Sequence, residues 1–553
     1  MSASECQGKR PDQTVKHRSD GRECREPSAL SHLGFQPVQK TPTIHVSSGF
    51  IWGTPDKGSL MANQLAKIDS VVHLMLENRS FDHMLGFLYT DSGNRSPTTG
   101  QAYDGLAGDE SNLDSSGNKV TVFRIDKNHP SPYLMPGCDP REGFNATNLQ
   151  LFGVDSPAST ARPSNSGFVT SFENAIAYDQ THGRPESIPG VKPSDIMGMY
   201  DPSVLPVMSA LAKKFAVCDA WFSSVPTETY PNRAFALTGT SLGHLKDDFT
   251  LLHTPSIFGR MSDAGLDWSA FGYNSEPFVR TDYLDTRAAD LRHFGHFSDF
   301  QRRAKAGTLP PYSFLEPAWG NAGNSQHPVT DVSLGEKLIY DVYQAVRSGR
   351  GWAKTLLIIT YDEHGGCYDH VPPPDGAIPP DNYRGDVDHL NFDFTRFGVR
   401  IPALLISPLI PAGTVFRASK GVIDHTSVLR TLQQRWPKIK PLAKRDAAAP
   451  GLGDVLTLTT PRTDDPLTGI TPPSSGGVVV PSASLPSKLQ KMQASVVASL
   501  PVRNEQGTYD HDQPELKTAA DVSSYIRDRT AAWELNTVRR RRPPAGSRRR
   551  VRR

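Results

Sequence analysis

Hydrophobic residues in this chain gather in short continuous runs separated by polar segments, a pattern typical of strands buried on both faces. The run 355–361, Thr-Leu-Leu-Ile-Ile-Thr-Tyr, is uninterrupted and partly β-branched, so it predicts a buried parallel strand. A second run of this kind covers 71–76, and a third apolar segment covers 215–222. Apolar residues at helical spacing between Leu334 and Val346 predict an amphipathic helix. These patterns indicate an α/β domain.

Polar oxygen-bearing residues follow the first two runs. Asp362 and Glu363 come directly after 355–361, and Glu77 and Asn78 come directly after 71–76. Open α/β sheets bind ligands at the carboxyl ends of their strands, so both pairs are expected at that edge. Adjacent carboxylates repel each other, and a hard, oxygen-ligated metal ion is the simplest way to hold them together. The alternative for each pair is a solvated strand end, and Asn78 also suits the N-cap of a following helix.

The segment 224–233, Ser-Val-Pro-Thr-Glu-Thr-Tyr-Pro-Asn-Arg, follows the third apolar segment. Pro231 suits the first residue of a helix, which would place Thr229 just ahead of the helix N-terminus. Free N–H groups and the helix dipole favour phosphate at such a position, and a metal-bound hydroxyl loses its proton more easily. The alternative is that Thr229 only caps the helix.

With these motifs the chain resembles the phosphoesterase family, which contains non-specific phospholipases C and respiratory-burst-inhibiting acid phosphatases. The resemblance runs in order from about Ser70 to about Trp436. The motifs that carry it are Glu-Asn-Arg-Ser-Phe-Asp-His at 77–83, Thr-Tyr-Pro-Asn-Arg at 229–233, His-Pro at 327–328, Asp-Glu-His-Gly-Gly-Cys-Tyr-Asp-His-Val at 362–371, and later blocks at 401–408 and 424–427. It implies an alkaline-phosphatase-like three-layer α/β/α sandwich with a mostly parallel central sheet, long loops and a C-terminal helical appendage.

The resemblance also implies a site and a mechanism. Its metal ligands would be Glu77, Asn78, Asp362, Glu363 and Thr229, holding a divalent ion such as Ca²⁺, Mg²⁺ or Mn²⁺. Thr229 matches the family's nucleophile, so its oxygen is expected to attack phosphorus in line and form a phospho-threonine intermediate that water then hydrolyses. A fixed cation and aligned donors would stabilise the charge that spreads over the phosphoryl oxygens.

His327 is the candidate general acid. In the family the matching histidine is thought to protonate the leaving oxygen, and an imidazole near its ordinary pKa can do so around neutrality. It lies in a loop before the predicted helix, where Ser333 and Glu336 match a capping box. The alternative is a loop histidine without a catalytic role.

Four residues are candidates for binding substrate. Glu142 stands where many relatives have the histidine of an Asp-Pro-x-His motif. A carboxylate repels phosphate unless it is protonated or bound to metal, so Glu142 is expected to bind a second cation or to select a positively charged head group such as choline. Asn232 and Arg233 belong to the Thr229 motif. His370 is a candidate for holding phosphate, and a structural hydrogen bond would explain it equally well.

A rival motif, Gly-Thr-Ser-Leu-Gly at 239–243, fits the nucleophile elbow of α/β-hydrolases. That elbow needs a strand before the serine and a helix after it. Here 231–237 reads as a helix and Gly239 as its C-cap, which disfavours a serine hydrolase.

Composition limits the classes of protein. The 553 residues, 37% of them hydrophobic, are enough for one large core with appendages, and no apolar segment is long enough to cross a bilayer. No Walker loop, dinucleotide-binding pattern or zinc spacing is present. Residues 1–21 lack the apolar segment of a secretory signal, so cytoplasmic residence is expected; secretion, by analogy with relatives, is the alternative.

Changes in composition along the chain predict four regions. They are a polar, partly disordered extension at 1–60, a catalytic domain at 61–450, a Pro/Ser-rich and helical appendage at 451–538 with helices at 488–500 and 519–535, and a disordered tail at 539–553. The tail holds nine arginines, so the other residues carry a formal charge of −7 against +2 for the whole chain. Such a tail attracts an anionic membrane surface, or is merely solvated; a specific nucleic acid is not expected.

Together these features predict a metal-dependent phosphoric-ester hydrolase. The expected activity is that of a phospholipase C, which cleaves phosphatidylcholine-like phospholipids to diacylglycerol and a phosphorylated head group. One alternative is an acid phosphatase of the same family. Another, from a different class, is a catalytically silent protein that binds lipid or polyanions.

Overall fold

The computed structural model describes residues 64–182, 187–248, 251–384, 390–477, 484–503, 508–510 and 513–541. The chain divides into two units, Met1–Leu60 and Met61–Arg553, and every described element belongs to the second. The predicted N-terminal extension and the arginine-rich tail after residue 541 lie outside the described residues. None of the helices in these ranges is long and apolar enough to span a membrane.

The centre of the described chain is an eight-stranded sheet in the order β12-β6-β11-β10-β1-β9-β7-β8. Its strands are β1 (Ser70–Leu76), β6 (Ala216–Val217), β7 (Trp268–Gly272), β8 (Phe294–His296), β9 (Tyr312–Glu316), β10 (Thr355–Tyr361), β11 (Ala403–Ile406) and β12 (Thr414–Val415). In this sheet β11 alone runs antiparallel to its neighbours. The mostly parallel sheet is therefore confirmed.

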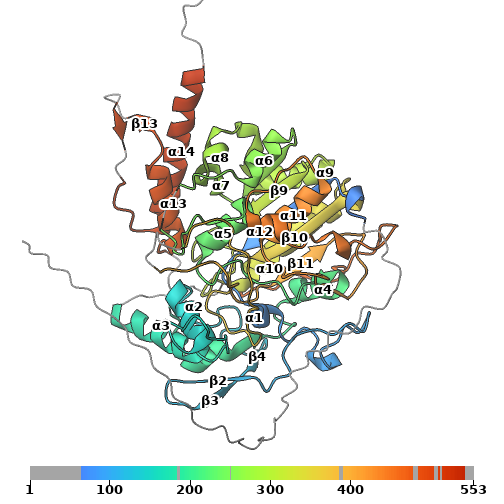
Figure 1. The fold of residues 1–553 in the computed structure, drawn as a ribbon, viewed down its shortest axis with the longest axis vertical. Coiled ribbons are helices and arrows are strands. Elements are labelled where there is room, and N and C mark those ends of the chain that lie inside the picture. The colour runs from blue at the N-terminus through green and yellow to red at the C-terminus, as the bar shows by residue number, and fades with distance from the viewer. Residues whose placement is uncertain are drawn as a thin grey trace, which may run out of the picture. The chain divides into compact units, whose positions relative to one another are not determined.

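Helices cover both faces of this sheet. Every residue of β1 and β10 is buried, as their continuous apolar sequences predicted, and such burial requires cover on both sides. α10 packs against α4 and α9, while α11 packs against α5 and α12, and Figure 1 shows these groups around the strands. Their bounds are α4 (Pro206–Lys214), α5 (Thr229–Thr238), α6 (Ile257–Asp263), α9 (Phe297–Ala306), α10 (Val332–Arg347), α11 (Thr426–Arg435) and α12 (Lys444–Ala448). The three-layer α/β/α sandwich is confirmed.

A long insertion between β1 and β6 has its own hydrophobic core, which includes Phe168, Phe172 and Met199. It comprises β2 (Ser111–Leu113), β3 (Lys119–Thr121), β4 (Phe123–Ile125), α2 (Phe144–Phe152), α3 (Phe168–His182) and β5 (Gly198–Tyr200). Three short helices complete the body: α1 (Phe81–Leu85), α7 (Val279–Asp282) and α8 (Leu284–Ala288). Because the segment 139–143 lies just before α2, the insertion brings Glu142 to the wall of the cavity described below.

The C-terminal part forms a small helical appendage. Helices predicted at 488–500 and 519–535 are confirmed as α13 (Lys488–Ala498) and α14 (Ala519–Arg541), joined by β13 (Val502–Arg503) and β14 (Tyr509–Asp510). α13 and α14 lie side by side and share an apolar core that includes Val497, Ile526 and Trp533. Gln493 fastens α13 to the body by donating to Thr281 Oγ1 at 2.8 Å. The appendage is thus packed on the catalytic body.

The predicted capping box at the start of α10 is wrong. The side chain of Asp331 caps this helix by accepting from the Ser333 amide at 2.9 Å. Glu336 instead accepts from the amides of Val207 and Met208 at 2.7 and 3.0 Å. These two amides are free donors in the first turn of α4, and a buried carboxylate satisfies both of them.

Candidate active site

Strand register brings the two predicted oxygen-donor pairs together. β1 and β10 are parallel neighbours, with Leu76 opposite Tyr361. Glu77 and Asp362 are the next residues on each strand, and both are buried. They therefore meet at the carboxyl edge of the sheet, where α/β proteins place their ligands.

Asn78 connects this edge to Thr229. Its backbone φ of 55° lies in the left-handed region, which asparagine tolerates better than most residues. Its amide donates to Asp362 Oδ1 at 2.9 Å, and its side-chain oxygen accepts from the Thr229 hydroxyl at 3.1 Å. The interpretation of Asn78 as an N-cap is wrong, because Ser80 caps α1 by accepting from the His83 amide.

Thr229 is buried and is the first residue of α5, two residues before Pro231, where the sequence predicted the helix to start. The next amide, that of Tyr230, donates to Asp247 Oδ1 at 2.7 Å. A helix N-terminus favours negative charge, so the hydroxyl lies where a phosphoryl group would be stabilised.

Asn232 and Arg233, which follow Thr229 in α5, make hydrogen bonds that fix the segments around the site. Arg233 Nε donates to Asp362 Oδ2 at 2.9 Å, and Arg233 Nη2 donates to the carbonyl of Leu76 at 3.0 Å. The Asn232 amide fixes the loop before Thr229 by donating to the carbonyls of Val225, Thr227 and Glu228. Both residues support the elements that carry the site, and their predicted contact with substrate stays a prediction.

The donor set fits a divalent metal ion. Glu363 is fully buried; its Oε2 accepts from the Gly365 amide at 2.7 Å, whereas its Oε1 has no hydrogen-bond partner among the described residues. Burial and the neighbouring Asp362 carboxylate raise the pKa of Glu363 well above its ordinary value, and burial likewise raises the pKa of Glu77. A cation would let these carboxyl groups stay ionised, and carboxylate and amide oxygens suit Ca²⁺, Mg²⁺ or Mn²⁺.

The loop that carries His327 has an unusual backbone. Gln326 and Val329 have φ values of 68° and 63°, in the left-handed region. For a β-branched residue such as valine this conformation is rare, and strained backbone of this kind is concentrated at functional sites. Nδ1 of His327 lies 3.0 Å from the Pro328 carbonyl, which orients the ring.

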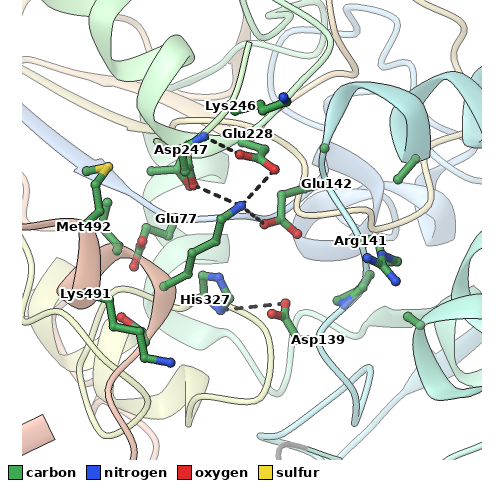
Figure 2. Close-up of a pocket in the computed structure, with 18 of the residues that line it drawn as sticks. Glu77, Asp139, Arg141, Glu142, Glu228, Lys246, Asp247, His327, Lys491 and Met492 are labelled. Atoms are coloured by element: carbon green, nitrogen blue, oxygen red, sulfur yellow. Dashed lines mark hydrogen bonds and ion pairs between the residues drawn. The ribbon is translucent and has the colours of Figure 1, made fainter. Parts of the chain in front are cut away.

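Neighbouring carboxylates keep the imidazole of His327 protonated. Burial would lower the pKa of its imidazole, but Asp139, Glu77 and Glu142 outweigh this effect and raise that pKa to about 9. Nδ1 lies 4.0 Å from Asp139 Oδ1, as the dashed line in Figure 2 marks. At neutral pH the ring therefore carries a proton that it can donate, as the proposed role of general acid requires.

Glu77, Thr229 and His327 line one cavity with a volume of about 1270 Å³. Glu142 also lines it, and burial together with Asp139 raises the pKa of Glu142 to about 7. Three further residues of the wall escaped the sequence analysis, namely Glu228, Asp247 and Lys488. Glu228 lies in the segment 224–233, directly before the recognised motif at 229–233, and the other two reach the wall through tertiary packing.

His370 belongs to a separate ionic cluster. Its Nδ1 lies 2.6 Å from Asp82 Oδ2, and Arg400 makes 2.9 Å ion pairs with Asp82 and Asp369. Burial would lower the pKa of His370, but Asp82 and Asp104 raise it to about 10. Among the described residues that line the cavity His370 is not found. Its predicted contact with phosphate stays a prediction.

This cluster has the spacing of a metal site but not the need for one. Of the described acidic, cysteine and histidine side chains, Asp82, Asp369 and His370 are the three whose ligand atoms all lie within 4.8 Å of one another. Among the described residues, Glu77, Asp362 and Glu363 do not form such a group of three. Arg400 and a protonated His370 balance the two aspartates, so the cluster is complete without a cation.

The rival serine-hydrolase motif lacks the required structure. α5 occupies 229–238, and Gly239 ends it in the left-handed conformation with φ 75°. Ser241 donates its hydroxyl to the His244 carbonyl at 2.7 Å. Because a helix precedes Ser241, the strand–serine–helix elbow is absent here, as the sequence analysis expected.

Comparison with known proteins identifies the class of enzyme. The sequence model of the phosphoesterase family matches residues 68–438, nearly the span over which the motifs occur in order. The chain belongs to the phosphoesterase family. It is accordingly a hydrolase that acts on phosphoric ester bonds.

Curated relatives are named phospholipases C. Non-specific phospholipase C6 of Arabidopsis thaliana is 35% identical over 421 residues, covering 72% of this chain and 74% of the relative. Non-specific phospholipase C4 of the same plant is 33% identical over 477 residues, covering 83% and 85%. Phospholipase C A of Mycobacterium tuberculosis is 27% identical over 440 residues, covering 72% and 78%.

Solved structures give weaker likenesses. A protein of the alkaline phosphatase superfamily from Vibrio parahaemolyticus is 15% identical and covers 45% of this chain and 64% of its own, with a TM-score of 0.26. Human ectonucleotide pyrophosphatase/phosphodiesterase 5 is 11% identical and covers 46% and 93%, with a TM-score of 0.28. Superpositions this partial do not bear on function.

Proposed function

We propose that the protein is a metal-dependent phospholipase C that cleaves phosphatidylcholine-like phospholipids to diacylglycerol and a phosphorylated head group. One observation carries the proposal: Thr229, at a helix N-terminus, is hydrogen-bonded to Asn78 at the sheet edge where Glu77 and Asp362 meet. The names of the plant and mycobacterial relatives support the substrate class.

The chain's own residues supply nucleophile, acid and supports. The Thr229 oxygen forms a bond to phosphorus while the bond from phosphorus to the glycerol oxygen breaks. His327 donates its proton to that leaving oxygen, which departs as the hydroxyl of diacylglycerol. Water then attacks the phosphorylated Thr229, gives a proton back to His327, and releases the phosphorylated head group.

The metal would be held by Glu77, Asn78, Asp362 and Glu363, with the Thr229 oxygen as a further ligand. When bound, it would promote loss of the Thr229 proton to solvent and offset negative charge on the phosphoryl oxygens. Arg233 keeps Asp362 oriented toward this set.

Glu142 gives the cavity wall an acidic character. It lies beside Asp139 and near Glu228 and Asp247, and these four carboxylates outnumber the two cationic groups beside them among the described residues, Lys488 and the protonated His327. An acidic wall of this kind favours a cationic head group such as choline over a neutral or anionic one.

The test compares wild type, Thr229→Ala, Thr229→Ser and the control Thr238→Ala on phosphatidylcholine and on a phosphomonoester, with and without chelator. Thr238 lies in the last turn of the same helix and donates to the Ala234 carbonyl, so its variant should keep activity. Wild type should release diacylglycerol, Thr229→Ala should lower kcat about 10³-fold or more, and Thr229→Ser should retain activity. Chelation should abolish turnover and added metal restore it.

Two results would count against the proposal. Release of inorganic phosphate from monoesters without any diacylglycerol would identify the acid-phosphatase alternative. Undiminished turnover by Thr229→Ala would remove Thr229 from the reaction altogether.

A further inference from the structure

The cavity is completed by a part of the chain that the family match does not include. The match ends at residue 438, whereas α13 begins at Lys488. Even so, Ser487, Lys488, Leu489 and Met492 line the same cavity as Thr229 and His327. The C-terminal appendage is thus a wall of the candidate active site.

Lys488 joins three carboxylates that come from separate segments. Its Nζ lies 2.8 Å from Glu228 Oε1, 3.7 Å from Asp247 Oδ2 and 3.9 Å from Glu142 Oε1. Figure 2 shows these three carboxylates turned toward one another, with dashed lines marking the ion pairs. Their side chains are only 13%, 4% and 12% exposed, so without a cation they would repel each other at close range.

This network fixes the start of α5. Glu228 directly precedes Thr229, and its carboxylate accepts from the Asp247 amide. Tyr230 directly follows Thr229, and its backbone amide donates to the Asp247 carboxylate at 2.7 Å. The backbone on both sides of Thr229 is therefore tied to groups that Lys488 holds together.

Lys488 does not contribute to the stability of α13. Ser487 and Gln490 form a capping box, with hydrogen bonds of 3.2 and 3.0 Å, that starts the helix at Lys488. A positive charge in the first helical turn is unfavourable to the helix dipole. Gln490 also donates to the Trp319 carbonyl at 3.5 Å, which anchors this end of α13 to the catalytic body. The carboxylate network, rather than helix stability, accounts for the ammonium at this point.

We propose that Lys488 is a positioning residue for the reaction at Thr229: its ammonium holds Glu142, Glu228 and Asp247 together and so keeps the N-terminus of α5 in place. The inference rests on the proposed function for its kinetic consequence. Its structural consequence, a fixed backbone around Thr229, is independent of any substrate.

The test uses full-length Lys488→Met, Lys488→Arg and the control Lys440→Met. Lys440 is exposed, is not among the residues that line the cavity, and has no ion pair among the described residues. Lys488→Met should lower kcat about 10- to 100-fold with a smaller change in KM, because the nucleophile is misplaced while the rest of the cavity remains. Lys488→Arg keeps the charge and should stay within about threefold of wild type, as should Lys440→Met.

Hydrogen–deuterium exchange supplies a readout without substrate. Amides in the peptide covering residues 228–232 should exchange faster in Lys488→Met than in wild type or Lys440→Met. Unchanged exchange and kcat in Lys488→Met would overturn the inference, as would a loss of kcat that Lys488→Arg fails to rescue. If wild type hydrolyses no phosphoric ester, the proposed function fails, and exchange alone decides whether Lys488 holds the α5 start.

Discussion

His327 shows how neighbouring charges prepare a residue for its role. Its pKa of about 9 comes from three carboxylates that overcome the effect of burial. One of them, Glu77, was expected from the sequence as a metal ligand. Another, Asp139, comes from the insertion before α2, and its proximity to His327 depends on tertiary packing. The motif was therefore sufficient to predict that His327 is a candidate general acid, but the protonation state of His327 could not be predicted from the sequence.

Replacing His327 with glutamine tests its role as general acid. The variant should lower kcat about 10²- to 10⁴-fold on phosphatidylcholine, whose alkoxide leaving group needs a proton. On a nitrophenyl phosphodiester the loss should be much smaller, because nitrophenolate leaves without protonation. The ratio of the two losses is the measurement, and equal losses on both substrates would contradict the assignment.

The ionic cluster around His370 predicts a pH-dependent stability. The pKa of His370 rises from 6.5 to about 10 in the folded protein, so its contribution is complete below pH 6.5 and is lost as pH rises through about 10. His370→Asn should therefore lower the free energy of unfolding by about 2 kcal/mol below pH 6.5, and by progressively less toward pH 10.

Urea unfolding of wild type and His370→Asn across this pH range measures the effect. His182→Asn is the control, since His182 is exposed at the end of α3, where its ring stacks on Tyr178 and its Nδ1 lies 2.9 Å from the Tyr178 carbonyl oxygen. A difference between wild type and His370→Asn that does not vary with pH would contradict the charge assignment.

Among the elements, those with strong local patterns were predictable. β1 and β10 were expected because strands buried on both faces require continuous apolar runs. β6 and β12 have two residues each, too few for any periodic signal. The pairing of Leu76 with Tyr361 is a long-range contact, and it follows from the fold as a whole rather than from either run.

Caps were less predictable than strands. Asn78 and Glu336 both match the residue types that cap helices, yet Asn78 bonds Thr229 and Glu336 caps a different helix, α4. In each case the side chain forms its hydrogen bond with a residue distant in sequence instead of with the start of the helix that follows it. The same reason explains why Asp247 and Lys488 gave no local signal.

The turn after β10 depends on Gly365. Its φ is +60°, and a Cβ there would lie 2.2 Å from the Asn78 carbonyl oxygen. Gly376 has a φ of +86°, and a Cβ at that residue would meet nothing within 4 Å. An alanine at Gly376 therefore suffers the same unfavourable backbone conformation as an alanine at Gly365, but no steric clash. Gly376→Ala should cost about 1–2 kcal/mol of unfolding free energy. Gly365→Ala should cost about 1–3 kcal/mol more and also lower kcat, because it displaces Asn78.

Chemical denaturation and turnover of the two alanine variants measure these effects. Equal losses of stability in both, with activity retained in Gly365→Ala, would mean that the contact between Gly365 and Asn78 does not shape the site.

At the scale of the whole molecule, the charge is divided between a mildly acidic body and an arginine-rich C-terminus. We propose that this tail makes peripheral contact with an anionic membrane surface. Replacing the six arginines after residue 541 with serine should weaken binding to phosphatidylserine-containing vesicles by about 1 kcal/mol per arginine near the surface. Turnover of a soluble ester should not change.

Vesicle co-sedimentation at low and high salt measures this binding. Wild-type binding should fall as salt rises, since exposed charges are screened. Equal binding by wild type and the serine variant at low salt would leave the tail without this role.

The central claim is that Thr229 becomes phosphorylated during turnover, and trapping that species tests it most directly. Acid quenching during turnover of a phospholipid labelled in its phosphate, followed by proteolysis and mass spectrometry, should place the label on the peptide that contains Thr229. Thr229→Ala should yield no labelled peptide and no turnover. Label on another residue, or turnover by Thr229→Ala at the wild-type rate, would contradict the account.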